Sequence, residues 1–393
     1  MDKKVIYVDN NATTKVAPEV VSAMLPFLNK FYGNPSSMHF FGGEVARHLE
    51  RARDQVAFLL GCDSSEIVFT SCGTESDNTA IIGSLEALSG NRKHLVTTIV
   101  EHPAVKNTMA YLSKKGYRVS EIGVDRQGLL DMNALKDAIT EETALVSVMY
   151  ANNETGVISP IEEIGKIAKE RGVLFHVDAV QAVGKIPLNM QKSTIDLLSL
   201  SGHKLHAPKG IGAMYIRKGV RMRPYLIGGH QERGRRAGTE AVPNIIAIGA
   251  ACELAAKNIQ EENTQVKARR DRMENWILKN IPDTSLNGHK EKRLPNTSNI
   301  GFEYIEGEAI LLTLSKEGIC ASSGSACSSG SLEPSHVLRA MQIPFTSIHG
   351  SIRFSLSRYT TDEEIDYIID KLPGVIQKLR AISPFSSKNM PSI

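Results

Sequence analysis

Short apolar runs alternate with amphipathic stretches along the first two thirds of the chain. The apolar runs, rich in β-branched residues, span 66–70, 94–100, 144–150, 173–177 and 195–200. Helical stretches such as residues 161–171 separate some of these runs, and residues 44–60 carry apolar side chains at helical spacing up to Gly61, a helix stop signal. Nearly continuous apolar strands that alternate with helices predict an α/β fold around a mostly parallel sheet.

The pattern changes after Pro243. Residues 244–280 form one long helical segment with few helix breakers, and shorter strands are predicted at 298–304, 318–321 and 351–356. Thr361 and Glu364 form a capping box before a final amphipathic helix. The sequence therefore predicts a large domain of residues 14–257 and a smaller α+β domain of residues 1–13 and 258–393, which the long helix connects.

Composition and charge exclude several classes of protein. The 393 residues are 41% hydrophobic and 23% charged, as in ordinary globular proteins, and the net charge of +3 gives no reason to expect nucleic-acid binding. No apolar run approaches the roughly 18 residues of a membrane span. The five cysteines are odd in number and form no Cys-x-x-Cys motif, so we expect reduced thiols, no intrinsic metal site and a cytoplasmic protein.

Polar residues follow most of the predicted strands directly. Ligands bind beyond the carboxyl ends of strands in open α/β sheets, so these residues are candidates for one site. They are Gly73 and Thr74, His102, Asn153, Asp178 with Gln181, and Ser201, His203 and Lys204. Singly, each has an ordinary structural explanation, such as a core histidine, a turn asparagine or a surface lysine.

Together these residues suit pyridoxal 5′-phosphate (PLP). This cofactor needs a lysine for a Schiff base, a carboxylate at the ring nitrogen and a cradle for the phosphate. Lys204, Asp178 and the Gly73–Thr74 turn could supply these three. A metal site built from His176 with Asp178, or from His203 with His206, is a weaker alternative.

Two further features lie in the predicted smaller domain. Residues 321–330 are all small and carry Cys327 near their centre, which fits a thiol nucleophile on an adaptable loop, although a flexible tether has the same composition. Arg353 lies in an apolar strand, where it could bind a substrate carboxylate or form a structural salt bridge.

The ordered motifs of the chain resemble the cysteine desulfurases of the NifS/IscS family, which are class V aminotransferase-like enzymes of PLP fold type I. The resemblance runs nearly end to end. It rests on the segments 7–14, 33–37, 101–105, 152–156, 176–181, 201–204, 236–239 and 323–327. Within the family, segments 72–76, 206–210 and 229–236 look most like the nitrogen-fixation branch, NifS.

The resemblance implies roles for these residues. Lys204 would carry PLP, Asp178 would hold the ring nitrogen, His102 would stack on the ring and assist proton transfer, and Cys327 would take sulfur from L-cysteine as a persulfide. Asn153 and Arg353 would bind the substrate. The other implied cofactor contacts are Gln181 to the phenolic oxygen, Gly73, Thr74, Ser201 and His203 to the phosphate, and Thr239 to the phosphate in the other subunit of a homodimer.

The resemblance also implies a sulfur acceptor, a NifU-like or IscU-like iron–sulfur scaffold, on which Cys327 could be a transient cluster ligand. Several alternatives remain open at this point. They are a housekeeping IscS-type desulfurase that also serves tRNA thiolation, a selenocysteine lyase, an aminotransferase, and a non-catalytic scaffold that keeps the fold.

Overall fold

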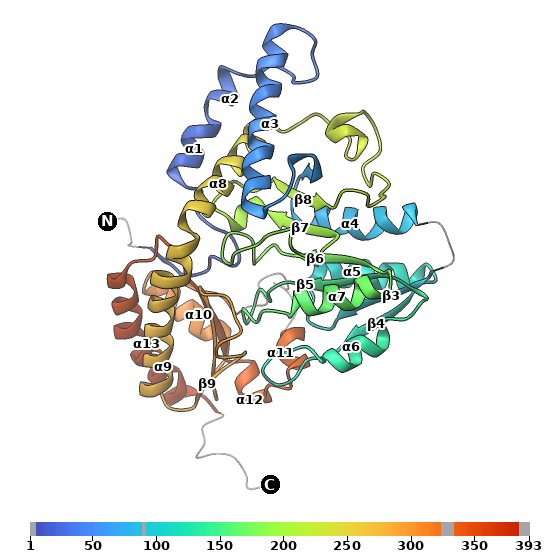
Figure 1. Ribbon diagram of the computed structural model, residues 1–393. Coiled ribbons are helices and arrows are strands. Elements are labelled where there is room, and N and C mark those ends of the chain that lie inside the picture. The colour runs from blue at the N-terminus through green and yellow to red at the C-terminus, as the bar shows by residue number, and fades with distance from the viewer. Residues whose placement is uncertain (1–4, 89–91, 324–333, 385–393) are drawn as a thin grey trace.

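The computed structural model describes residues 5–88, 92–323 and 334–384, and its largest element is a seven-stranded sheet (Figure 1). The strand order is β2-β8-β7-β6-β5-β3-β4, and β8 alone runs antiparallel to its two neighbours in this sheet. The strands are β2 (Ile67–Thr70), β3 (His94–Thr98), β4 (Arg118–Ile122), β5 (Thr143–Met149), β6 (Leu174–Asp178), β7 (Leu197–Ser201) and β8 (Gly212–Ile216). The predicted α/β fold with a mostly parallel sheet is confirmed.

Helices cover both faces of this sheet. Successive strand residues point to opposite sides, so each strand contributes side chains to a core on either face. On one face Leu95 and Leu145 pack with α4 (Gly73–Ala87) and α5 (Pro103–Lys114). On the other face Val96 and Val146 belong to a core shared with α6 (Met132–Ala138) and α7 (Ile161–Glu170). This burial on both faces explains why the strands appear as continuous apolar runs in the sequence.

A long helical segment leads from the large sheet to a second core (Figure 1). It consists of α8 (Val242–Glu261), one π-helical turn (Glu262–Val266) and α9 (Lys267–Asn280). α8 packs against α3 (Phe40–Leu60), which ends at Gly61 in the left-handed conformation. The helices predicted at 44–60 and 244–280 are therefore confirmed, the first beginning four residues earlier.

The second core surrounds a three-stranded antiparallel sheet of order β12-β10-β9. Its strands are β9 (Thr284–Leu286), β10 (Thr297–Phe302) and β12 (Ser351–Ser355). α9 packs against α13 (Asp362–Ile382), whose capping box of Thr361 and Glu364 is present as predicted. The remaining helices are α1 (Pro18–Met24), α2 (Pro26–Asn29), α10 (Gly307–Lys316), α11 (His336–Ala340) and α12 (Phe345–Ile348).

The N-terminal segment joins the C-terminal part of the chain. β1 (Ile6–Tyr7) pairs in parallel with β11 (Ile319–Cys320), and Asp9 forms a bridge with Ser355. The exact domain boundaries stay a prediction. This arrangement brings residues 10–14 to the space between the two sheets, where they meet the carboxyl ends of the large sheet's strands.

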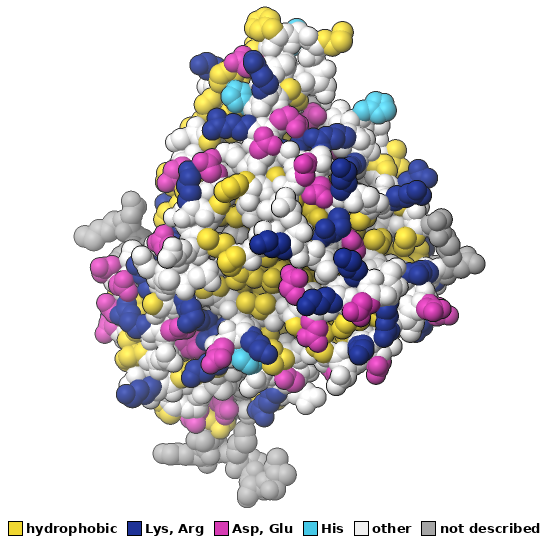
Figure 2. Space-filling model, viewed as in Figure 1, with side chains coloured by type: hydrophobic (Ala, Val, Ile, Leu, Met, Phe, Trp, Pro, Cys, Tyr) yellow, Lys and Arg dark blue, Asp and Glu magenta, His cyan; other side chains and the backbone are white. Residues whose placement is uncertain are grey.

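The surface carries charges of both signs. Figure 2 shows lysine and arginine side chains interspersed with aspartate and glutamate over the face in view. Within the part of the chain that the structure describes, no helix combines the length and apolar character needed to cross a membrane.

Candidate active site

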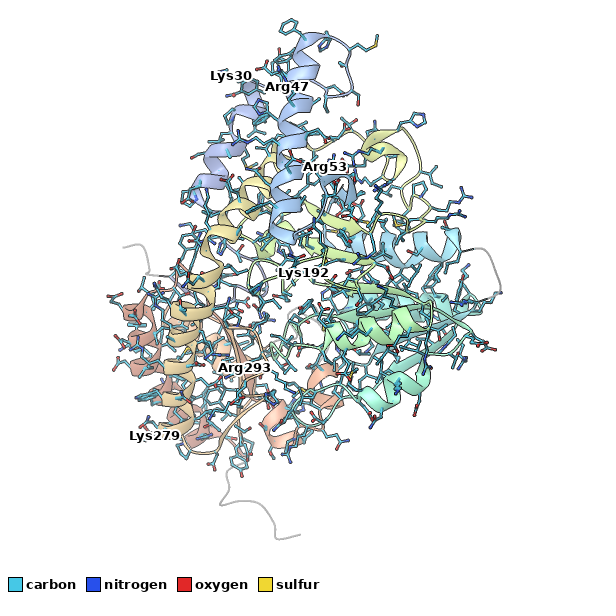
Figure 3. All side chains as sticks on the ribbon, in the orientation of Figure 1. Lys30, Arg47, Arg53, Lys192, Lys279 and Arg293 are labelled. Carbon is cyan, nitrogen blue, oxygen red and sulfur yellow. The ribbon has the colours of Figure 1, made fainter. Side chains whose placement is uncertain are left out.

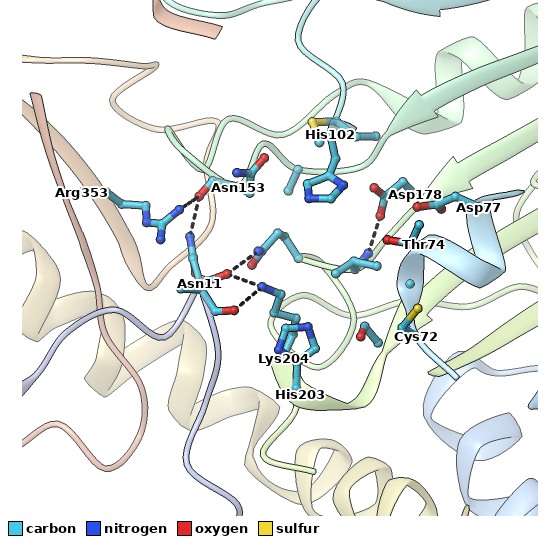
Figure 4. Close-up of a pocket in the computed structure, with 17 residues that line it drawn as sticks. Asn11, Cys72, Thr74, Asp77, His102, Asn153, Asp178, His203, Lys204 and Arg353 are labelled. Atoms are coloured by element: carbon cyan, nitrogen blue, oxygen red, sulfur yellow. Dashed lines mark hydrogen bonds between the residues drawn. The ribbon is translucent and has the colours of Figure 1, made fainter. Parts of the chain in front are cut away.

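A cavity of about 410 Å³ opens at the carboxyl ends of β5, β6 and β7. Seventeen residues line it, and most come from loops that follow strands (Figure 4). Ten of the twelve residues proposed from the sequence are among them: Gly73, Thr74, His102, Asn153, Asp178, Gln181, Ser201, His203, Lys204 and Arg353. The fold thus brings together motifs that lie up to 280 residues apart in the chain.

Lys204 ends the short 3₁₀ turn Gly202–Lys204 directly after β7. Its Nζ atom donates hydrogen bonds to the backbone oxygens of Asn11 (2.5 Å) and Ala12 (2.7 Å). Another lysine, the buried Lys185, is nearby, but it does not line this cavity. Lys204 is therefore the amine that the pocket presents to a ligand.

Asp178 is the last residue of β6 and is 5% exposed. Its Oδ1 accepts a hydrogen bond from the backbone N–H of Val180 (2.9 Å). Burial raises the pKa of Asp178, and His102 and Lys204 oppose that rise. An acid in this position needs a cationic partner to remain ionised, which a protonated ring nitrogen would provide.

Asp77 is a second buried acid in the pocket. It lies on α4, is 1% exposed, and burial together with the neighbouring Asp178 raises its pKa well above the usual value. Its Oδ1 lies 3.6 Å from Nε2 of His176 and makes no hydrogen bond within the described residues. Mutual repulsion between Asp77 and Asp178 therefore disfavours ionisation of both acids at once.

His102 caps the N-terminus of α5. Its Nδ1 accepts a hydrogen bond from the backbone N–H of Ala104 (3.1 Å), so the neutral ring carries its proton on Nε2. Burial lowers the pKa of His102, Asp178 opposes this effect, and Lys204 adds to it. The pocket wall therefore presents a neutral imidazole as a flat ring with an N–H donor.

Gly73 and Thr74 begin α4, and Ser201 at the end of β7 and His203 in the following turn line the same pocket. The first N–H groups of a helix lack intrahelical partners and attract negative charge. A Cβ on Gly73 would lie 2.8 Å from the Val180 side chain, so glycine is required there. The Ser201 hydroxyl is buried and has no hydrogen-bond partner among the described residues. A buried polar group without a partner is expected where a ligand forms the missing hydrogen bond.

Arg353 and Asn153 form the opposite side of the pocket. Arg353 lies on β12 and is 2% exposed; it donates to the Asn153 backbone oxygen (2.9 Å) and to Asp9 Oδ1 (2.6 Å). The salt bridge that the sequence left as an alternative is thus present. Because Arg353 also lines the pocket, binding of a substrate carboxylate is compatible with it.

Two of the proposed site residues lie elsewhere. Thr239 is exposed, follows the turn Gln231–Gly234, and does not line the pocket within this single chain. Cys327 lies outside the described residues, which end at Ser323 and resume at Pro334.

The sequence did not single out Asn11, Cys72 or Asp77 as site residues, yet all three line the pocket. Asp77 follows Gly73 by four positions on a helix, and this spacing places both residues on one face. The helical spacing could therefore have identified Asp77 as a site residue. Asn11 comes from a segment near the N-terminus, and only the tertiary structure shows that it reaches Lys204.

Comparison with known proteins shows the family of the chain. Residues 6–368 match the family model Aminotransferase class-V. Cysteine desulfurase 2 of Trichormus variabilis is 63% identical over 98% of this chain and 96% of its own length. Cysteine desulfurase NifS of Azotobacter vinelandii is 56% identical over 98% of this chain and 96% of its own length. A solved structure described as a NifS-like protein superimposes with a TM-score of 0.90, at 40% identity, over 96% of this chain and all of the other. The chain belongs to the class V aminotransferase family and, within it, to the cysteine desulfurases.

Proposed function

We propose that this enzyme uses PLP to remove sulfur from L-cysteine, releasing L-alanine and leaving the sulfur on Cys327 as a persulfide. The observation that carries the proposal is the pocket, where the amine of Lys204, the buried acid Asp178 and the guanidinium of Arg353 line one cavity. The high identity to proteins named cysteine desulfurase supports the same activity.

The residues of the pocket fit PLP. The unpartnered Ser201 hydroxyl and the N–H groups at the start of α4 suit its phosphate, and Asp178 suits its ring nitrogen. Lys204 would hold the cofactor covalently, His102 would lie over its ring and Gln181 would donate to its phenolic oxygen. The remaining phosphate contacts would come from Thr74, His203 and, in a homodimer, Thr239 of the partner subunit. Bound PLP would supply an electron sink for the electrons released when the Cα–H bond of the substrate breaks.

The protein's own groups would then direct the reaction. Arg353 and Asn153 would orient the substrate carboxylate, which fixes the position of the Cα–H bond. The Cys327 thiolate would attack the sulfur of the substrate, so that an S–S bond forms as the C–S bond breaks. The carbon fragment takes up a proton and leaves as alanine.

The sulfur on Cys327 would pass to an iron–sulfur scaffold of the NifU-like or IscU-like kind. The similarity to a protein named NifS favours a supply of sulfur for nitrogenase-related clusters. Sulfide is a component of the cluster, and the persulfide sulfur becomes sulfide on two-electron reduction by an external reductant.

The test is to incubate the purified enzyme with L-cysteine and to follow alanine, sulfide and the mass of the peptide that contains Cys327. We expect equal amounts of alanine and transferred sulfur, and one additional sulfur atom on that peptide. Amino exchange with pyruvate and no added sulfur would instead identify an aminotransferase. Competition between cysteine and selenocysteine would show which substrate the enzyme prefers.

A further inference from the structure

A buried lysine lies behind the pocket wall and contacts two amides that line the pocket. Lys185 is 7% exposed. Its Nζ atom donates to Gln181 Oε1 (2.9 Å) and to Asn11 Oδ1 (3.3 Å). On its other side, Lys185 and Glu262 line a separate small cavity of about 20 Å³. The hydrogen bonds of Lys185 to Gln181 and Asn11 therefore connect it to the pocket.

These contacts fix which way each amide points. The oxygen of a side-chain amide only accepts hydrogen bonds and its nitrogen only donates them, whereas a lysine amine next to an amide oxygen donates. With its oxygen held by Lys185, Gln181 turns Nε2 toward the Asn11 backbone oxygen (2.9 Å). Asn296 Nδ2 also donates to Asn11 Oδ1 (3.1 Å), so Lys185 and Asn296 hold that oxygen together. A rotation of either amide by 180° would place N–H groups against these donors, so a single orientation of each is favoured.

Asn11 connects Lys185 to the opposite side of the pocket through its amide nitrogen. Its Nδ2 donates to Thr297 Oγ1 (2.9 Å) and to the Asn153 backbone oxygen (3.2 Å). The same Asn153 oxygen accepts from Arg353 Nη1 (2.9 Å). Figure 4 shows the line of contacts from Lys204 through Asn11 and Asn153 to Arg353.

We propose that Lys185 is a positioning residue for substrate binding: together with Asn296 it holds the Asn11 amide in one orientation, and it thereby keeps the Asn153–Arg353 side of the pocket aligned with a substrate carboxylate. The inference rests on the proposed function of the pocket. Lys204 is held by backbone oxygens, which a change at Lys185 leaves in place. The charge of Lys185 also acts on Lys204, but the hydrogen bonds of Lys185 lead to the carboxylate side of the pocket, so we expect its removal to weaken recognition of the carboxylate and to leave the cofactor attached.

The placement of Lys185 is costly for a group that only fills space. Burial lowers its pKa to about 7, and Glu262 opposes that shift. An apolar side chain of similar length would fill the same volume without that cost. The two directed hydrogen bonds to pocket amides are what an apolar side chain would lack.

The test compares two sulfur-free amines that differ in the carboxylate alone, L-alanine and ethylamine. Their equilibrium affinities for the PLP-loaded enzyme are measured from the change in cofactor absorbance. In the Lys185→Met variant we expect the preference for L-alanine over ethylamine to fall about tenfold, while cofactor loading stays as in the wild type. In Asn11→Asp, which keeps an acceptor for Lys185 but removes the donor to Asn153, the preference should fall similarly.

The control is Lys192→Met, which removes an exposed lysine (Figure 3) and should leave the preference unchanged. An unchanged preference in folded Lys185→Met would overturn the inference; should that variant not fold, an unchanged preference in Asn11→Asp would do so. Neither binding measurement requires desulfuration. A wild-type enzyme that binds L-alanine but forms no alanine from cysteine would contradict the proposed function alone.

Discussion

Arg53 and Glu232 form a buried ion pair between α3 and the turn Gln231–Gly234. Two hydrogen bonds, of 2.7 and 2.9 Å, join the guanidinium to the carboxylate, and both side chains are at most 5% exposed. Glu232 also accepts from the backbone N–H of Phe69 in β2 (2.9 Å). The pair thereby attaches the segment that leads to Thr239 to the edge of the large sheet.

The same turn contains backbone strain. Glu232 (φ 49°) and Arg233 (φ 59°) both adopt the left-handed conformation that non-glycine residues avoid at a cost of roughly 1 kcal/mol each. The ion pair with Arg53 offsets this cost. It explains how an arginine-rich surface segment keeps a defined shape beside the pocket.

We predict that Glu232→Gln destabilises the protein by about 3 kcal/mol, because the buried Arg53 charge loses its partner. The measurement is urea unfolding followed by circular dichroism. The matched control is Glu142→Gln, which breaks the exposed Arg118–Glu142 pair (3.1 Å) and should change stability by less than about 0.5 kcal/mol. Equal losses of stability in the two variants would show that the strained turn does not depend on Arg53. Figure 3 labels Arg53 on α3.

The second prediction concerns the two lysines, Lys204 and Lys185. Lys204→Ala should remove the absorbance of covalently attached PLP, because Lys204 is the amine that lines the pocket. Lys185→Met should retain that absorbance. The spectra of both variants after incubation with PLP and gel filtration provide the measurement. The opposite result, with absorbance lost only in Lys185→Met, would assign the covalent link to Lys185.

Most of the fold and much of the pocket could be predicted from the sequence. Apolar runs predicted β2, β3, β5, β6 and β7, because strands buried on both faces leave a continuous hydrophobic signal. β4 was missed because it is an edge strand with exposed Arg118 and Glu121. β8 was missed because it begins among glycines, Gly210 and Gly212, that resemble a turn. Strand ends located the site since parallel strands present their carboxyl ends at one edge.

The contacts between distant segments could not be predicted. Lys185 has no motif of its own, and its role depends on a hydrogen bond to Asn11, 174 positions earlier. The Arg53–Glu232 pair spans 179 positions. Such pairs arise from the packing of the elements, and the local pattern of either residue does not encode the partner.

The third prediction separates two thiols. Cys72 lines the pocket at the start of α4 and could receive sulfur in place of Cys327. We expect Cys327→Ser to abolish formation of alanine, although the change in absorbance on substrate binding persists. Cys72→Ser should still gain sulfur on the Cys327 peptide, as mass spectrometry would show. Sulfur found on the Cys72 peptide of Cys327→Ser, together with normal turnover, would reassign the nucleophile.

The last prediction uses the buried acid beside His102. Glu101 is fully buried; its Oε1 accepts from Thr98 Oγ1 (2.7 Å) and from the backbone N–H of Met149 (2.9 Å). Burial raises the pKa of Glu101 from its ordinary value of 4.5 to about 8. Between these values the folded protein binds a proton that the unfolded chain has released, so this residue lowers stability as the pH rises.

Glu101→Gln keeps an oxygen that can accept both hydrogen bonds and removes the titration. Relative to the wild type, the variant should therefore gain stability by up to about 1.4 kcal/mol for each pH unit between about pH 5 and pH 8, and no further gain should follow above that range. Urea unfolding of both proteins across this range is the measurement, with Glu121→Gln on the exposed edge strand as control. A stability difference that stays constant with pH would mean that Glu101 is ionised in the folded protein, and that the carboxylate beside His102 is paired with a charge instead of being held neutral by burial.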